Sequence, residues 1–214
     1  MSHSIVYVVD DEDAVRDSLQ LLLQSAGFDT AGCASAYEFL ATYDPSQSGC
    51  LVLDVRMPRM SGLELQQTLN RKGWMLPVIF ISGHGDVPMA VEAMREGAFD
   101  FIQKPFSDAA LLKRVRLALK QDDQQRQEWK SKEALSTRWA QLTNREKQVA
   151  GHLCKGDANK VIAIDLGISE RTVELHRAHI MRKMQARGIA QLVRMMLSIG
   201  QSSEPSTDTD KQAS

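Results

Sequence analysis

Five side chains that could carry out phosphoryl transfer follow or end short apolar segments in the first half of the chain. They are Asp10, Asp11, Asp54, Ser82 and Lys104. Crowded carboxylates repel one another unless a cation offsets their charge. Mg²⁺ suits that role, because it prefers oxygen ligands and commonly joins carboxylates to a phosphate. These residues therefore predict a magnesium-dependent phosphoryl site if the fold brings them together.

The residue types also predict separate roles in the reaction. One carboxylate would attack phosphorus, and the charge on the three equatorial phosphoryl oxygens would need neutralising. Mg²⁺ would serve one oxygen, the compact Lys104 ammonium a second, and the Ser82 hydroxyl a third. Taken singly, each acid is more simply explained as a solvated strand-end or helix-cap residue. The five together, at the ends of four segments, favour the site.

Alternating β-rich and amphipathic segments predict an α/β domain that would gather these residues. We expect strands at 4–9, 28–33, 50–53, 76–82 and 99–102, and helices at 13–26, 35–43, 61–72, 87–96 and 107–121. Strands that are apolar on both faces indicate a five-stranded parallel, doubly wound sheet covered on both sides. Ligands of such sheets bind beyond the carboxyl ends of the strands, where the five side chains lie.

The second half of the chain predicts an all-α domain of four helices over residues 140–200. Thr143 and Glu146 form a capping-box pattern, and Gly156 stands where a helix should end. Shorter helices at 158–166 and from Ser169 onward are joined by a glycine-containing turn, and the second of them is basic. This arrangement is typical of a helix-turn-helix.

Charge and composition separate the two halves. Residues 1–125 carry a net charge of −6 and residues 126–200 carry +7, which favours a polyanionic partner for the second half. We expect residues 121–139, which are polar and helix-permissive, to form a helical linker. The polar residues 201–214 predict a disordered tail.

Several classes of protein are disfavoured. The three cysteines, Cys33, Cys50 and Cys154, are odd in number and widely spaced, so no disulfide framework is expected. The first residues lack a signal peptide's apolar core, and no apolar run approaches transmembrane length. A cytoplasmic protein without a membrane partner is expected.

Residues 1–120 resemble the receiver (CheY-like) domain of two-component response regulators. The resemblance rests on VVDDE at 8–12, LVLDVRMPRMSGLEL at 51–65, FISGHGDV at 80–87 and FDFIQKPF at 99–106. It implies that Asp54 accepts a phosphoryl group from a sensor histidine kinase. It also implies that Mg²⁺ is held by Asp10, Asp11, Asp54 and the backbone carbonyl of Arg56.

The same resemblance implies a switch. Ser82 and Phe101 correspond to a pair in which the hydroxyl moves to the phosphate and the ring turns inward. Lys104 would pair with the phosphoryl group, and the Lys104–Pro105 bond would be cis. Ser82 stands where threonine is more frequent, so it keeps the hydroxyl and loses a methyl group.

Residues 142–197 resemble the LuxR-type helix-turn-helix of the FixJ/NarL response regulators. The resemblance rests on LTNREKQV at 142–149, NKVIAIDLGISERTVELHRAHIMRKM at 159–184 and AQLVRM at 190–195. The stretch GHGDVPMAVEAM at 83–94 favours the FixJ-like branch.

A short helix of this kind fits the major groove of DNA. The residues expected to face base edges are Glu174, Leu175 and Ala178, with Arg177 beside them. Contacts with phosphates set the position of the protein along the DNA but do not read its sequence. The residues expected to make them are Lys160, Arg171, Thr172, Arg182 and Lys183.

The resulting interpretation is a phosphorylation-activated transcriptional regulator. Its expected partners are a histidine kinase, a double-stranded DNA operator and, once phosphorylated, a second copy of the chain; RNA polymerase is a further candidate. We expect no enzyme activity beyond slow self-catalysed phosphorylation and dephosphorylation. The alternatives are a phosphorylation-independent regulator whose receiver serves only as an interaction module, and a small-molecule phosphotransferase. His84 is interpreted as a loop residue. His176 and His179, three residues apart on one helix, are not expected to bind zinc, and His176 is interpreted as packing or contacting backbone.

Overall fold

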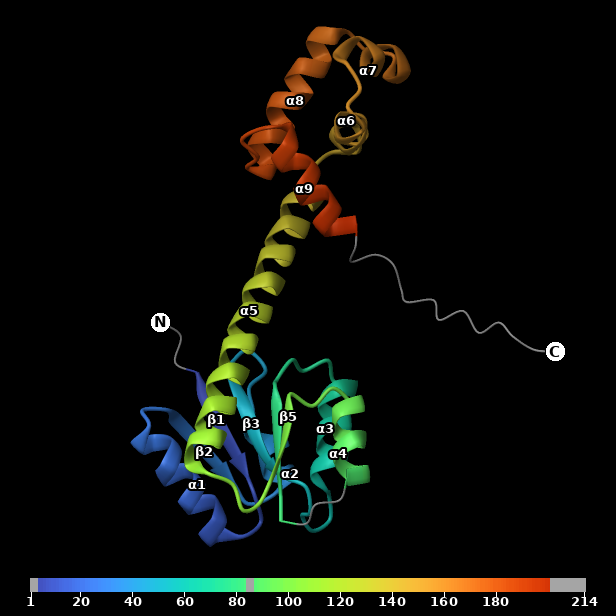
Figure 1. Ribbon diagram of the computed structural model, residues 1–214. Coiled ribbons are helices and arrows are strands. Elements are labelled where there is room, and N and C mark those ends of the chain that lie inside the picture. The colour runs from blue at the N-terminus through green and yellow to red at the C-terminus, as the bar shows by residue number, and fades with distance from the viewer. Residues whose placement is uncertain (1–3, 84–86, 201–214) are drawn as a thin grey trace, which may run out of the picture. The chain divides into compact units, whose positions relative to one another are not determined.

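The computed structural model of the protein describes residues 4–83 and 87–200 (Figure 1). Two compact units divide the chain, residues 1–127 and residues 128–214. The expectations for His84 and for the tail at 201–214 lie outside the described residues.

The first unit contains a five-stranded parallel sheet in the order β2-β1-β3-β4-β5 (Figure 1). The strands are β1 (Ile5–Val9), β2 (Asp29–Cys33), β3 (Gly49–Asp54), β4 (Val78–Ser82) and β5 (Asp100–Gln103). The helices between them are α1 (Asp13–Ser25), α2 (Ala36–Thr42), α3 (Gly62–Arg71) and α4 (Val87–Arg95). The predicted fold is confirmed, and these elements end within two residues of the positions expected from sequence.

Apolar side chains on both faces of the sheet explain its uninterrupted hydrophobic strands. Successive residues of a strand point to opposite faces. Along β1, Tyr7 and Val9 pack into a layer with α2, α3 and α4 residues, whereas Val6 and Val8 pack into a layer with α1 and α5 residues. The sheet is therefore closed on both sides, and polar groups are left at its edges and ends.

The last helix of the first unit, α5 (Asp108–Ala140), is longer than expected. It runs for 33 residues, so the segment predicted as a helix at 107–121 and the helical linker at 121–139 form one continuous helix. Its buried residues are Leu111, Val115, Ala118 and Asp122. The boundary between the two units falls within this helix, after Gln127.

A buried ion pair holds α5 to the start of β3. Asp122 is fully buried, and it accepts hydrogen bonds from the Ser48 hydroxyl at 2.7 Å and the Gly49 amide at 3.0 Å. Arg126 Nε donates to both oxygens of Asp122, at 2.8 and 2.9 Å. The rest of the guanidinium donates to the consecutive carbonyls of residues 45–47. We call Asp122, Arg126 and their partners at 45–49 the β3 clamp.

The second unit contains the predicted helix-turn-helix. Its helices after α5 are α6 (Asn144–Lys155), α7 (Asn159–Leu166), α8 (Glu170–Met184) and α9 (Ile189–Gly200). The capping box of Thr143 and Glu146 is confirmed. Gly156 and Gly167 end α6 and α7 with φ of 87° and 64°, a left-handed conformation that glycine adopts without strain. Ser169 caps α8.

One apolar core joins the four helices of this unit. It contains Val149, Leu153, Ile162, Val173, Ile180, Met184 and Leu192. Because α8 buries Val173, Ile180 and Met184, its opposite face is left to solvent. In the described part of the chain, no helix is long and apolar enough to cross a membrane.

Candidate functional site

Two carboxylates and one ammonium meet at the carboxyl ends of the strands. Lys104 Nζ lies 3.4 Å from Asp10 Oδ2 and 3.4 Å from Asp54 Oδ1. Asp10 follows β1, Asp54 ends β3 and Lys104 follows β5, so the three side chains come from distant parts of the sequence. The backbone amide of Lys104 donates to the carbonyl of Ser82 at 2.7 Å, which ties the lysine to the end of β4.

Backbone hydrogen bonds fix the orientation of both carboxylates. Asp54 Oδ2 accepts from the Arg56 amide at 2.7 Å, and Asp10 Oδ1 accepts from the Glu12 amide at 2.9 Å. The Asp54 side chain is 13% exposed and that of Asp10 is 3% exposed. The remaining oxygens, Asp54 Oδ1 and Asp10 Oδ2, are the ones directed at Lys104.

The environment disfavours a charged Asp54 in the absence of a further cation. Burial raises the pKa of Asp54, and the nearby charge of Asp10 adds to this effect. The Arg56 amide and Lys104 act in the opposite direction but do not outweigh it. The protein alone only partly offsets the negative charge of Asp54. A cation bound beside this carboxylate would therefore be stabilised by it.

Lys104 contacts two of the three predicted carboxylates, Asp10 and Asp54. Asp11 is exposed, and no group of three His, Cys, Asp or Glu side chains placed to hold a metal occurs within residues 4–83 and 87–200. Lys104 instead supplies positive charge between Asp10 and Asp54. The paired oxygens of these two acids still have the chemistry that a hard cation prefers, so the residues fit Mg²⁺. The assignment of Asp11 and the Arg56 carbonyl as ligands stays a prediction.

The residues predicted as a switch lie on the two neighbouring strands. Ser82 is buried at the end of β4. On β5, Phe101 is partly exposed, and its ring lies 6.2 Å from that of Phe80, its partner across the strands. The Lys104–Pro105 peptide bond is cis, as the resemblance implied.

The close packing of α3 against the end of β3 was not predicted from the sequence. A Cβ at Gly62 would lie 2.3 Å from the Asp54 carbonyl oxygen, so only glycine lets the helix begin this close to Asp54. The start of α3 is fixed by a capping box between Ser61 and Glu64. The sequence predicted this helix at 61–72, within one residue of its observed bounds, but no role was predicted for Gly62.

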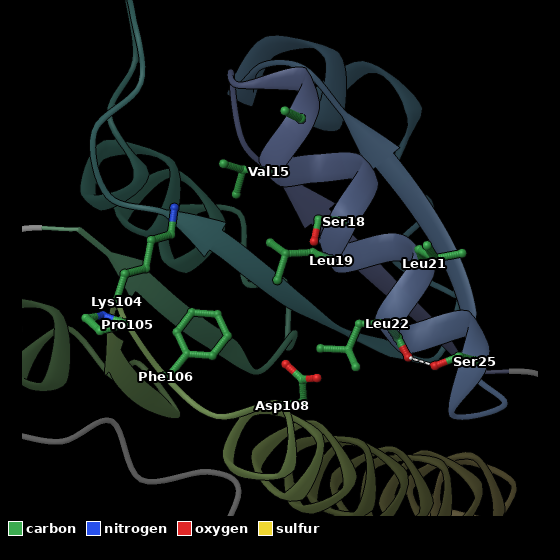
Figure 2. Close-up of a pocket in the computed structure, with 11 residues that line it drawn as sticks. Val15, Ser18, Leu19, Leu21, Leu22, Ser25, Lys104, Pro105, Phe106 and Asp108 are labelled. Carbon is green, nitrogen blue, oxygen red and sulfur yellow. Dashed lines mark hydrogen bonds between the residues drawn. The ribbon is translucent and has the colours of Figure 1, made fainter.

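An apolar pocket adjoins the acidic site on the α1 side. It has a volume of about 760 Å³ and is lined by α1 residues and by the segment that leads into α5. Figure 2 shows Lys104 at this pocket, with Leu19, Leu22 and Phe106 around the same space. Leu21, also on the lining, is 69% exposed. The sequence analysis predicted no pocket here, because the segments that line it, α1 and the residues leading into α5, lie far apart in the sequence.

The residues expected to face bases lie on the open face of α8. Glu174, Leu175 and Ala178 are exposed, and Leu175 has 56% of its surface accessible. The exposed residues among those expected to contact phosphates are Lys160, Arg171 and Arg182. This placement is compatible with the DNA-facing roles, which stay predictions.

Three other residues assigned to DNA have partners within the protein. The Thr172 hydroxyl and amide both bond the Ser169 cap, at 2.8 and 3.1 Å. Arg177 donates to Asn159 Oδ1 at 2.8 Å. Lys183 Nζ lies 2.7 Å from Glu146 Oε2. For these residues, a contact with DNA would compete with an existing internal contact.

Two protein families match separate parts of the chain. Residues 6–116 match the family described as the response regulator receiver domain. Residues 140–196 match the bacterial regulatory proteins of the luxR family. The first match covers the sheet and the acidic site, and the second covers the helix-turn-helix.

Relatives with both domains are similar along almost the whole chain. The transcriptional regulatory protein FixJ of Azorhizobium caulinodans is 50% identical over 195 residues, which cover 91% of this chain and 92% of the relative. The response regulator protein TodT of Pseudomonas putida is 46% identical over 192 residues, covering 90% and 85%. Among solved structures, the response regulator StyR matches with a TM-score of 0.85 at 44% identity, covering 91% of this chain and 98% of that one. Full-length FixJ from B. japonicum matches with a TM-score of 0.57 at 40% identity, covering 94% and 99%.

Proposed function

The chain belongs to the FixJ-like two-component response regulators, and we propose that phosphorylation of Asp54 controls DNA binding by its LuxR-type domain. The observation that carries this proposal is the placement of Lys104 between Asp54 and Asp10. A carboxylate held by a backbone amide on one oxygen and faced by an ammonium on the other is arranged to receive a charged group.

The proposed reaction transfers a phosphoryl group from a phosphohistidine of a sensor kinase. Asp54 Oδ1 forms the new bond to phosphorus while the phosphorus–nitrogen bond breaks and the imidazole leaves with its electron pair. Mg²⁺, when bound by Asp10 and Asp54 with Asp11 and the Arg56 carbonyl, supplies positive charge that offsets the phosphoryl oxygens. Lys104 moves from the two carboxylates to a phosphoryl oxygen. Each cycle consumes one donor, so no turnover of small molecules is expected.

The proposed response passes through Ser82 and Phe101. The Ser82 hydroxyl donates to a phosphoryl oxygen, and the Phe101 ring turns from its partly exposed position toward the interior. The surface of α4, β5 and the start of α5 then changes, and two copies pair through it. Such a switch requires that phosphorylation bias two preexisting states.

We expect the kinase to dock at the apolar pocket beside Lys104. A donor histidine must come within bonding distance of Asp54, so the donor domain has to cover the rim of the acidic site. The rim on the α1 side presents Leu21, Leu22 and Phe106, which suits an apolar helical surface. The expected occupant of this pocket is therefore the phosphohistidine-bearing domain of the kinase.

The open face of α8 supports the DNA-binding role. An exposed helix face carrying Glu174, Leu175 and Ala178, flanked by exposed Arg171 and Arg182, has the size and charge of a major-groove reader. Two paired copies would bind two half-sites, so the operator should share their two-fold symmetry.

The test compares the mass of the protein in solution with and without beryllofluoride, a phosphoryl mimic, in Mg²⁺. Light scattering after size-exclusion chromatography should show a monomer that becomes a dimer. The Asp54→Asn variant should stay monomeric under both conditions. If the wild type shows no shift while still binding DNA, weight moves to a regulator that uses its receiver only as an interaction module.

A further inference from the structure

A buried acid in the second unit is held by the end of the recognition helix. Glu146, on α6, is only 2% exposed. Its Oε2 accepts from the Thr143 amide at 2.8 Å and lies 2.7 Å from Lys183 Nζ, on the last turn of α8. The same ammonium donates to the carbonyl of Gln141 at 3.3 Å.

The charge of Glu146 depends on these partners. Burial acts to raise its pKa, but the hydrogen bonds from Lys183 and Thr143 outweigh burial and hold the pKa at about 2. His179 Nδ1 lies 3.7 Å from the other oxygen, Oε1. His179 and Lys183 are four residues apart and therefore share one side of α8. Glu146 on α6 thus contacts the last turn of α8 through Lys183, and His179 lies near its second oxygen.

The neighbouring basic residues of α8 are placed differently. Arg182 and Arg171 are exposed, whereas the Lys183 side chain is 29% exposed and its ammonium is occupied by a buried carboxylate. Moving Lys183 to a DNA phosphate would leave the charge of Glu146 buried without its main partner, which is costly. This cost opposes a contact between Lys183 and a DNA phosphate.

We propose that Lys183 is a positioning residue, which sets the rotation and axial position of the recognition helix through Glu146. The inference rests on the proposed DNA-binding function and revises the assignment of Lys183 to phosphate contact. The core residues Val173, Ile180 and Met184 hold α8 by apolar packing, which tolerates small rotations. The ion pair adds a directional contact, so that the face with Glu174 and Leu175 meets the groove at one angle.

The effect of salt on DNA affinity separates the two roles. A lost phosphate contact weakens binding to every sequence alike and reduces the slope of log K against log salt by about one per protomer. Lost positioning weakens the specific complex and leaves that slope and nonspecific binding unchanged. The probes are a duplex enriched from a random pool by the wild-type chain and a scrambled duplex, both measured by anisotropy with the full chain in Mg²⁺ and beryllofluoride.

Three variants make the comparison. Lys183→Met should weaken binding to the enriched duplex at least tenfold, with an unchanged salt slope and unchanged binding to the scrambled duplex. Arg182→Met is the matched control, and it should weaken both duplexes and reduce the slope. Adding Glu146→Gln to Lys183→Met should cause little further loss of specific affinity, because the contact is already broken, whereas two independent roles would add their losses.

The outcomes are distinguishable. A reduced slope with equal weakening of both duplexes for Lys183→Met overturns the positioning role, as does a clear further loss of specific affinity on adding Glu146→Gln. Thermal unfolding of each variant shows whether a loss of binding reflects unfolding. If Lys183→Met does not fold, the double variant, in which no buried charge is left unpaired, takes its place. Weaker specific binding with an unchanged salt slope then supports positioning, and a reduced slope overturns it. Failure of the proposed function would look different, because the wild type would then bind neither duplex.

Discussion

Asp54 carries a charge that the folded protein stabilises poorly by itself. Its pKa is raised, chiefly by burial, so at neutral pH its ionised form favours unfolding relative to a neutral side chain. The same deficit creates a demand for a cation or for a group that neutralises the carboxylate. Reactivity and reduced stability thus have one cause at this residue.

Replacing Asp54 by Asn should therefore raise the thermal midpoint of the metal-free protein at pH 7 by a few degrees. Lys104 keeps Asp10 as a partner, so little is lost in exchange. Scanning calorimetry with and without Mg²⁺ measures this, and Mg²⁺ should stabilise the wild type more than the variant. A lower midpoint for the Asp54→Asn variant than for the wild type, both without metal, would contradict this prediction.

The ionised Glu146 should stabilise the folded protein, in contrast to the ionised Asp54. Its pKa of about 2 lies below the ordinary value of 4.5, so its stabilising effect is complete above about pH 5 and is lost as pH falls toward 2. Glu146→Gln should lower stability at pH 7 and flatten the acid dependence of the second unit. Urea unfolding followed by Trp139 fluorescence, with the other two tryptophans replaced by Phe, tests this; the exposed Glu174→Gln is the control and should retain the wild-type profile.

At the scale of elements, the β3 clamp fixes the end of the receiver part of α5. Arg126→Ala leaves the fully buried Asp122 with only Ser48 and Gly49 as partners. We expect a loss of about 3 kcal/mol in unfolding free energy of the first unit. Hydrogen exchange should also quicken around residues 119–127. The exposed Glu128→Ala is the control, and equal effects from both variants would argue against the clamp.

The helix α1 presents a second element-scale prediction. Leu21 is exposed on the lining of the pocket beside Lys104, so Leu21→Arg should reduce phosphotransfer from the cognate kinase about tenfold or more by disrupting an apolar contact. Labelling of Asp54 by acetyl phosphate needs no protein partner and should be unchanged. If both donors slow equally, the effect lies in the acidic site and not in docking.

The acidic site was predictable because its residues are fixed by local pattern. A strand that ends at an aspartate places that carboxylate at the sheet's carboxyl edge wherever the strand lies, so Asp10, Asp54 and Lys104 could be placed together. The partners of Asp122 could not, because Ser48 is 74 residues away and the surrounding sequence is as polar as a solvated linker. The contact between Lys183 and Glu146 could not be predicted for a related reason: a basic residue on a recognition helix gives no sign of an acid buried on another helix.

At the scale of the whole molecule, two units with separate cores predict separable activities. A fragment of residues 128–214 should bind the enriched duplex without phosphorylation, because its core and its exposed α8 face are complete within that unit. If the receiver inhibits, the unphosphorylated full chain should bind more weakly than the fragment in the same anisotropy assay. Equal affinity would show that phosphorylation acts by another route.

The β3 clamp also limits where the receiver and DNA-binding domains of such regulators can be recombined. A crossover that joins a foreign receiver to this chain after residue 116 or 120 would separate Asp122 and Arg126 from the loop at 45–49 that they contact. A crossover after Gln127 would carry the clamp along intact. The receiver unit, with its clamp, is therefore about ten residues longer than the family match that ends at 116. Functional hybrids should be found mostly among junctions after Gln127.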